Sequence, residues 1–269
     1  MNSNGTWDCV TCSVEDPTGG PEALRALIRN ECAVLVLRDL LSPAIVEETR
    51  RRVGDHSRRA LATRYVNGTL TTIGPYLAKH LAQPERYFAD AHVTDEVFSD
   101  AAQDPRLLTR EGLRAFLGLR SCAVACETDG RRYADSVVRI HADGVRNPLH
   151  NDNIMRDAGS TGLVLRLLRY QLSCIVCIQE CDEGGELIHY RKTWHQDDEA
   201  YKIKDGLGYD RGVVHGAPSQ VFKPRTGDVY IINPTNYHEI ERVRGRDRIT
   251  LGFFIGFLGD ALSDAIVWS

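Results

Sequence analysis

The stretch that most constrains the fold is Arg248 to Phe257, which reads Arg-Ile-Thr-Leu-Gly-Phe-Phe-Ile-Gly-Phe. Its odd-numbered residues are all large and apolar, whereas its even-numbered residues are mostly polar or very small. Because the side chains of a strand alternate between two faces, one face can pack on a core while the other leaves room for a ligand. The pattern therefore predicts a strand that lines a ligand-holding β-barrel.

A second feature is the pair His150 and Asp152, which is accompanied by His238 much later in the chain. On an extended segment, residues two apart point to the same face. Two imidazoles and one carboxylate on one side of a metal form the facial triad of non-heme Fe(II) oxygenases, which leaves the other positions open. We therefore predict that His150, Asp152 and His238 are metal ligands.

The His-x-Asp spacing also occurs at His141 and Asp143, which compete with this assignment. That earlier pair follows a strand-like run, residues 136–140, and runs directly into the turn-forming residues 144–148. Because a ligand pair is expected on a strand rather than inside a turn, the sequence favours the later pair. The alternative interpretation of His150 is a surface loop histidine, since this spacing is common by chance.

An arginine and a threonine on the polar face of the 248–257 strand are candidate ligand-binding residues. Arg248 lies ten residues past His238, so a short hairpin can bring its guanidinium close to the metal. The planar fork of an arginine suits a carboxylate, and Thr250 could add a hydrogen bond. Arg246 has the same parity but lies nearer the turn, which makes it the second choice. The alternative for Arg248 is a solvated edge strand.

With these residues in view, the sequence resembles the 2-oxoglutarate- and Fe(II)-dependent oxygenases that have a double-stranded β-helix fold. The shared pattern adds a Gly-Gly-Glu-Leu strand start at residues 184–187 and a Pro-x-x-Gly-Asp turn at 224–228, and it covers about residues 135–258. The resemblance implies that His150, Asp152 and His238 hold Fe(II). It also implies that Arg248 and Thr250 bind 2-oxoglutarate, with O2 as the further cosubstrate.

Within that family, the chain resembles the branch that includes free-standing halogenases of alkaloid biosynthesis. Those halogenases carry Gly where this chain has Asp152, and the missing carboxylate opens a coordination position for chloride. The retained Asp152 implies oxygen insertion instead. We therefore expect a dioxygenase that oxidises an unactivated C–H bond of a small molecule, by hydroxylation, in natural-product or amino-acid tailoring.

Three alternatives to hydroxylation remain open. The same oxidising chemistry can end in desaturation, cyclisation or epimerisation, and the outcome depends on the pose of the substrate. A cupin-like hydrolase or isomerase would not need the carboxylate pairing of Arg248. A non-catalytic, cupin-like ligand-binding barrel would retain the fold alone.

The predicted fold is mostly β with flanking helices, built on a jelly-roll, cupin-like double-stranded β-helix core. We expect a single oxygenase domain over residues 1–269, with helical and strand support at 1–134, the core at 135–258 and a C-terminal tail at 259–269. Residues 54–75, which contain several Gly, Asn and Pro turn formers, are expected to form loops near the site. The polar stretch 194–209 is expected to act as a substrate lid.

The charge and the hydropathy of the chain limit its partners. The net charge of −4 argues against nucleic acid, which requires a basic surface. No stretch approaches the roughly 20 apolar residues of a membrane span. Residues 1–5 lack the basic and apolar regions of an export signal. We therefore expect a cytoplasmic protein with a small-molecule substrate, while the oligomeric state stays undetermined.

Two of the cysteine pairs have a spacing typical of zinc sites. Cys9 and Cys12, together with Cys174 and Cys177, could supply four thiolates. However, Cys174 and Cys177 lie in a strand-like run, where a three-residue spacing sends side chains to opposite faces. We therefore expect buried, reduced thiols instead of a zinc site.

Overall fold

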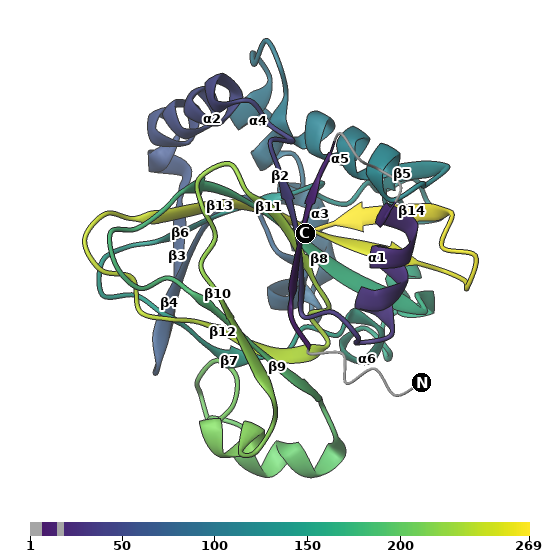
Figure 1. Ribbon diagram of the computed structural model, residues 1–269, viewed down its shortest axis with the longest axis vertical. Coiled ribbons are helices and arrows are strands. Elements are labelled where there is room, and N and C mark those ends of the chain that lie inside the picture. The colour runs from purple at the N-terminus through teal and green to yellow at the C-terminus, as the bar shows by residue number, and fades with distance from the viewer. Residues whose placement is uncertain (1–6, 15–18) are drawn as a thin grey trace.

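Two β-sheets form the body of the protein (Figure 1) in the computed structural model, which describes residues 7–14 and 19–269. The larger one, the major sheet, has the strand order β1-β2-β11-β8-β13-β6-β4-β3, and β14 pairs with β13 and β5 at its side. The smaller one, the minor sheet, has the order β10-β9-β12-β7. The predicted β-rich jelly-roll core with flanking helices is confirmed. Residues 1–5, which carried the expectation about export, lie outside the described residues.

The bounds of the strands follow their order in the chain. The major sheet contains β1 (Cys9–Ser13), β2 (Val34–Arg38), β3 (Leu61–Tyr65), β4 (Gly68–Ile73), β5 (Ser121–Val124), β6 (Val137–His141), β8 (Tyr170–Gln179), β11 (Val229–Ile232), β13 (Arg248–Phe257) and β14 (Asp264–Trp268). The minor sheet contains β7 (Asn147–His150), β9 (Leu187–Thr193), β10 (Ser219–Phe222) and β12 (Asn236–Ile240).

Helices from the N-terminal half cover the outer face of the major sheet (Figure 1). They are α1 (Gly20–Ile28), α2 (Pro43–Asp55), α4 (Val93–Phe98) and α5 (Pro105–Phe116), while α3 (Pro84–Asp90) and α6 (Ile154–Asp157) lie apart from this layer. The local sequence fixes the start of α2, because Ser42 Oγ accepts a hydrogen bond from the Ile45 amide and Pro43 opens the helix. The main core therefore lies between these helices and the sheet.

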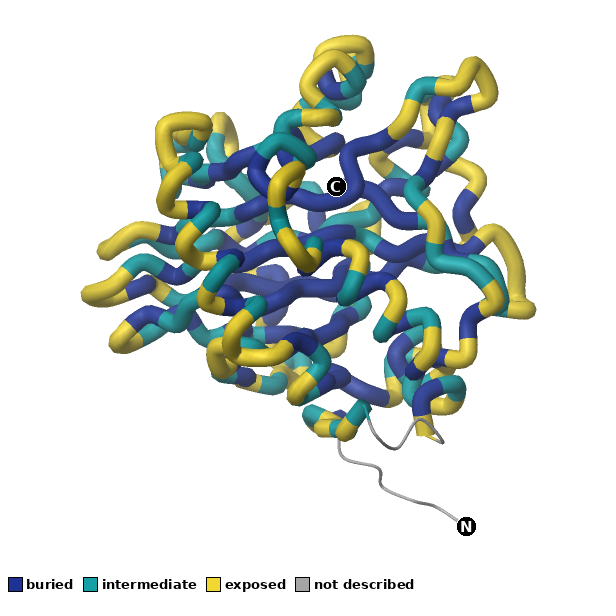
Figure 2. Tube along the Cα trace, turned by 90° about the horizontal axis from the view of Figure 1, so that it is seen from above, coloured by how far each residue is buried: buried dark blue, intermediate teal, exposed yellow. Residues whose placement is uncertain are grey.

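The alternation along β13 decides which side chains reach the inside of the barrel. Leu251, Phe253, Ile255 and Phe257 are buried in the main core against the helices. The even-numbered residues face the other way: Arg248 and Thr250 line a cavity between the two sheets, whereas Phe254 stacks on Trp268 in a second, smaller core cluster. The predicted barrel-lining strand is confirmed. Figure 2 shows how burial is distributed over the described residues, with buried strands at the centre and exposed loops around them.

Residues 54–75 differ from the loops that were predicted. Helix α2 continues to Asp55, and β3 and β4 form an antiparallel hairpin that extends the major sheet. Tyr65 pairs with Gly68, so the turn between these two Thr-containing runs is Val66-Asn67, and Asn is a residue that favours turns. The sequence therefore carried a hairpin signal that was interpreted only as a loop.

Cys174 and Cys177 lie on opposite faces of their strand, as expected from their three-residue spacing. Cys174 lies in the main core beneath the helices, whereas Cys177 lies on the opposite face of β8, next to Arg248. Burial raises the pKa of the Cys177 thiol to about 12, so this thiol stays protonated. Cys9 and Cys12 are only half-buried, so the expectation of buried thiols does not hold for that pair.

Among the described helices, none is both long and apolar enough to span a membrane.

Candidate metal centre and its cavity

The predicted ligands His150, Asp152 and His238 come together at one end of the minor sheet. His150 is the last residue of β7 and pairs directly with His238 on β12, with 4.3 Å between the ring centroids. One carboxylate oxygen of Asp152, Oδ2, lies 3.8 Å from the Nε2 atom of each histidine. The three ligand atoms lie within 4.8 Å of one another, and within the described residues no other group of three has this arrangement. They could hold one metal ion.

The position of Asp152 corrects one step of the sequence argument. The pair was expected on a strand, but β7 ends at His150, and Asp152 lies in the loop that leads into α6. Its amide donates a hydrogen bond of 2.9 Å to the carbonyl oxygen of Pro234, close to the start of β12. This backbone contact holds the carboxylate beside the two rings, where continuation of the strand was expected to place it.

Backbone contacts fix the orientation of both imidazoles. Nδ1 of His150 lies 2.7 Å from the carbonyl oxygen of Pro148, and Nδ1 of His238 lies 3.0 Å from that of Asn236. A carbonyl oxygen can only accept, so each Nδ1 carries the proton and each Nε2 keeps its lone pair. Burial, assisted by the neighbouring His150, holds the pKa of His238 well below its usual value. A neutral ring with a free Nε2 is the form that binds a metal.

The triad opens into a cavity of about 120 Å3 between the two sheets. Arg248 and Thr250 enter it from β13, and each is almost completely buried. Nη2 of Arg248 donates a hydrogen bond of 2.8 Å to the hydroxyl oxygen of Tyr230 on β11. Apolar side chains complete the walls, among them Leu70, Ile175, Leu187, Ile232 and Ile240. A guanidinium at one end and a carboxylate-histidine cluster at the other suit a small anion that also reaches a metal.

The competing pair His141 and Asp143 does not converge. Asp143 is exposed in the turn after β6, where its Oδ1 accepts a hydrogen bond from the Gly245 amide. His141 instead points into the cavity and is 2% exposed. Neither of its ring nitrogens has a hydrogen-bond partner. Burial and the guanidinium of Arg248 lower the pKa of His141 to about 3, so the ring is neutral.

Arg139 is a cavity residue that the sequence analysis missed. It lies on β6 opposite Thr250, and its Nη1 occupies the space above Gly252, 3.3 Å from where a β-carbon would stand. Burial lowers the pKa of its guanidinium, and no described residue forms a hydrogen bond or an ion pair with it. The sequence could have predicted this position, because Arg139 is two residues before His141 on the same predicted strand and therefore shares its face.

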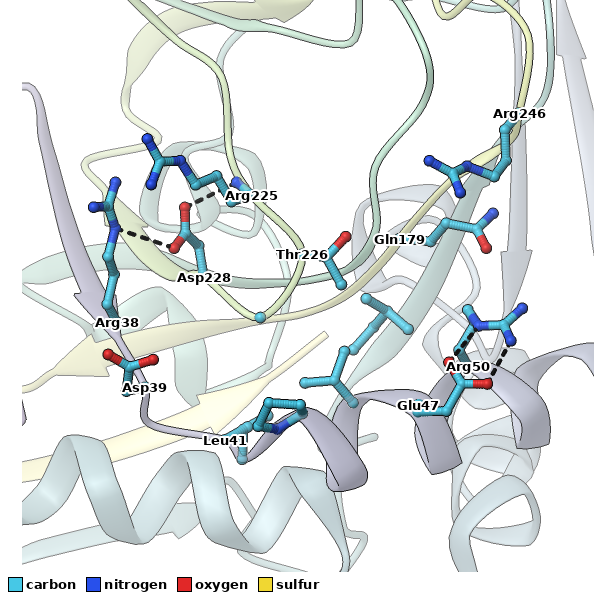
Figure 3. Close-up of a pocket in the computed structure, with 14 residues that line it drawn as sticks. Arg38, Asp39, Leu41, Glu47, Arg50, Gln179, Arg225, Thr226, Asp228 and Arg246 are labelled. Atoms are coloured by element: carbon cyan, nitrogen blue, oxygen red, sulfur yellow. Dashed lines mark hydrogen bonds and ion pairs between the residues drawn. The ribbon is translucent and has the colours of Figure 1, made fainter.

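Arg246, the second choice for binding a carboxylate, lies outside this cavity. Its side chain is more than half exposed and forms an ion pair with Asp182. It borders a different, larger hollow of about 630 Å3 under α2, shown in Figure 3. Several charged residues around that hollow are paired with each other, as Arg50 is with Glu47. The structure therefore separates Arg246 from the metal centre.

Two loops meet at the mouth of the cavity. Tyr65 and Tyr76 have their hydroxyl oxygens 3.0 Å apart at its edge. Leu207, from the stretch that was expected to be a lid, also lines the cavity. The side chain of Asn67 holds this loop, because its Nδ2 donates to the Leu207 carbonyl at 2.7 Å and its Oδ1 accepts from the Leu207 amide at 2.8 Å. The function of the stretch as a lid stays a prediction.

Known proteins with a similar sequence or fold include several enzymes. The family described as "Carrier-protein-independent halogenase WelO5" matches residues 6–269. The leucinostatins biosynthesis cluster protein S of Purpureocillium lilacinum is 26% identical over 152 residues, which are 53% of this chain and 60% of that protein. The chain thus spans less than two thirds of the length of this curated relative.

Solved structures share the fold at low sequence identity. An N-substituted L-amino acid dioxygenase from Burkholderia ambifaria AMMD has a TM-score of 0.63 at 15% identity, over 93% of this chain and 91% of that chain. Its complex with alpha-KG (2-oxoglutarate) has a TM-score of 0.59 at 17% identity, with the same coverage of both chains. The alpha-ketoglutarate-dependent epimerase SnoN from nogalamycin biosynthesis has a TM-score of 0.55 at 14% identity, over 91% and 86%. These likenesses show the fold.

Proposed function

Because the chain belongs to the family of the carrier-protein-independent halogenase WelO5, and so to the Fe(II)- and 2-oxoglutarate-dependent oxygenases, we propose that it hydroxylates an unactivated C–H bond of a small molecule. The observation that carries the proposal is the carboxylate of Asp152, which lies 3.8 Å from Nε2 of both His150 and His238. With this carboxylate as the third protein ligand, the position that a halide would need is taken. Membership of a family that is described as a halogenase also disfavours the non-catalytic barrel and the cupin-like hydrolase.

Different residues of the cavity bind the metal and the cosubstrate in this proposal. Nε2 of His150 and of His238 and Oδ2 of Asp152 hold Fe(II), each oriented by a backbone contact. Arg248, held by the Tyr230 hydroxyl, binds the distal carboxylate of 2-oxoglutarate, and Thr250 adds a hydrogen bond there. When bound, iron with 2-oxoglutarate and O2 supplies the oxidation that replaces hydrogen by hydroxyl. The apolar walls exclude water from the reacting carbon.

We extend the proposal to tailoring of a natural product or of an amino-acid derivative. The support is that the relative from Purpureocillium lilacinum is a biosynthesis cluster protein, and that one structural neighbour is an N-substituted L-amino acid dioxygenase. The mouth of the cavity, with Tyr65, Tyr76 and Leu207, offers aromatic and apolar contacts to such a molecule.

Product analysis tests hydroxylation directly. Purified protein is supplied with Fe(II), 2-oxoglutarate, ¹⁸O2 and chloride, together with a panel of amino-acid derivatives and natural-product precursors. We expect a product that gains one labelled oxygen atom, with succinate released in equal amount. A chlorinated product would refute the role of Asp152, and loss of two hydrogens would replace hydroxylation by desaturation or cyclisation. An isomer of unchanged mass would indicate epimerisation.

A further inference from the structure

His141 is a buried polar residue whose position the metal centre does not explain. It lies at the end of β6, is 2% exposed, and lines the cavity between the sheets. Both ring nitrogens are shielded from solvent, and neither has a hydrogen-bond partner. A buried imidazole without partners destabilises a fold, so native proteins rarely keep one without a role.

A structural role does not account for His141, as a second buried histidine shows. In His189, Nδ1 lies 2.8 Å from the Ala33 carbonyl oxygen and Nε2 lies 3.1 Å from that of Asn233. Those contacts tie β9 to neighbouring segments, which is the usual task of a core histidine. His141 makes no comparable contact, and it is not one of the three residues whose ligand atoms converge.

The neighbour of His141 indicates what its ring can bind. His141 pairs across the sheet with Arg248, so the two side chains lie next to each other on the inner face. Nη2 of Arg248 is engaged with the Tyr230 hydroxyl, and Arg248 Nε has no partner. Because the two side chains are adjacent, an anion held by Arg248 comes within reach of the His141 ring. A neutral imidazole adds one N–H donor to such a site without adding a second positive charge beside the guanidinium.

We propose that His141 donates a ring N–H to the distal carboxylate of 2-oxoglutarate, as a second binding residue beside Arg248. This inference rests on the proposed function, because it uses the assignment of Arg248 to that carboxylate. The two residues of the pair His141 and Asp143 then have different roles: His141 binds the cosubstrate, and Asp143 belongs to the turn. It also accounts for a ring with a hydrogen-bond donor standing beside Arg248.

The test compares two keto acids that differ at the distal carboxylate. The affinity of anaerobic Fe(II)-loaded protein for 2-oxoglutarate and for 2-oxobutanoate, which lacks this carboxylate, is measured from the visible charge-transfer band and by calorimetry. For His141→Phe we expect 2-oxoglutarate to bind about 10-fold to 100-fold more weakly, the range for a lost hydrogen bond to a charged group. The affinity for 2-oxobutanoate should stay the same. His141→Gln, which keeps a donor, should recover part of the loss.

A second readout uses the protein without metal or cosubstrate. Because His141→Phe removes an unsatisfied polar group, its melting temperature should equal or exceed that of the wild type. A lower melting temperature with equal weakening of both keto acids would overturn the inference in favour of a structural role. Unchanged affinity for 2-oxoglutarate would overturn it as well. A wild-type protein that binds neither acid would instead refute the assignment of the cavity, and the inference with it.

Discussion

Gly185 offers a sharp test of how the cavity is built, because its lack of a side chain leaves space for Arg248. A β-carbon on Gly185 would lie 2.5 Å from Cys181 Sγ and 3.1 Å from Arg248 Cδ. Its φ of 72° is also left-handed, which costs an L-residue about 1–2 kcal/mol. Displacing two buried side chains adds about 1–3 kcal/mol. We therefore expect Gly185→Ala to lower the free energy of unfolding by about 2–5 kcal/mol in all.

The assay separates backbone strain from the displacement of Arg248. Gly216 is the matched control, since its φ is 75° and a β-carbon there would meet nothing within 4 Å. In urea denaturation, Gly216→Ala should lower the free energy of unfolding by only about 1–2 kcal/mol, the cost of backbone strain, and its affinity for 2-oxoglutarate should be unchanged. Gly185→Ala should lose more stability and bind 2-oxoglutarate about tenfold more weakly, because the Arg248 guanidinium shifts away from the distal carboxylate of 2-oxoglutarate. Equal stability losses with equal affinities would refute the reasoning.

Three further predictions follow from the site. Arg248→Lys keeps the charge but loses the planar fork, so 2-oxoglutarate should bind about tenfold more weakly in a charge-transfer titration; equal affinity would contradict the bidentate role. Changing a residue that only orients a metal ligand typically weakens metal binding about 10–100-fold, and Asp152→Asn should weaken Fe(II) binding by more than this. Asp143→Asn should leave Fe(II) binding unchanged, and calorimetry measures both affinities. The pKa of His141 is lowered to about 3 and that of His189 to about 4, so the unfolded chain binds more protons below about pH 6.5. Stability should be full above that pH and fall by up to about 1.4 kcal/mol per pH unit for each ring toward pH 4, and His141→Phe should remove one such contribution in urea denaturation.

Much of the barrel could be predicted because its pattern is local. The alternation in residues 248–257 separates the odd-numbered face, which packs in the main core, from the even-numbered face, whose first part at Arg248 and Thr250 lines the cavity. The start of α2 at Ser42 and Pro43 was likewise readable, since capping depends on neighbours in the chain. The pairing of His150 with His238 needed more than local pattern, and the family resemblance supplied that information.

Other parts of the site could not be derived from spacing alone. Asp152 faces the histidines because its amide donates a hydrogen bond to the carbonyl oxygen of Pro234. The two residues are 82 positions apart in the chain, so no local sequence pattern predicts this contact. Arg139 shares the inner face of β6 with His141, but an isolated arginine on a strand has no spacing motif that distinguishes a cavity residue from a solvated one. The 61–73 hairpin was missed for another reason: its turn signal at Asn67 was counted as a loop former, although the flanking runs are strands.

The two hydrogen bonds of Asn67 tie the β3–β4 turn to the loop that carries Leu207. One carboxamide therefore couples two segments that are 140 residues apart in the chain, so neither can swing away from the cavity mouth without releasing the other. A substitution of Asn67 that removes its carboxamide therefore releases both segments at once.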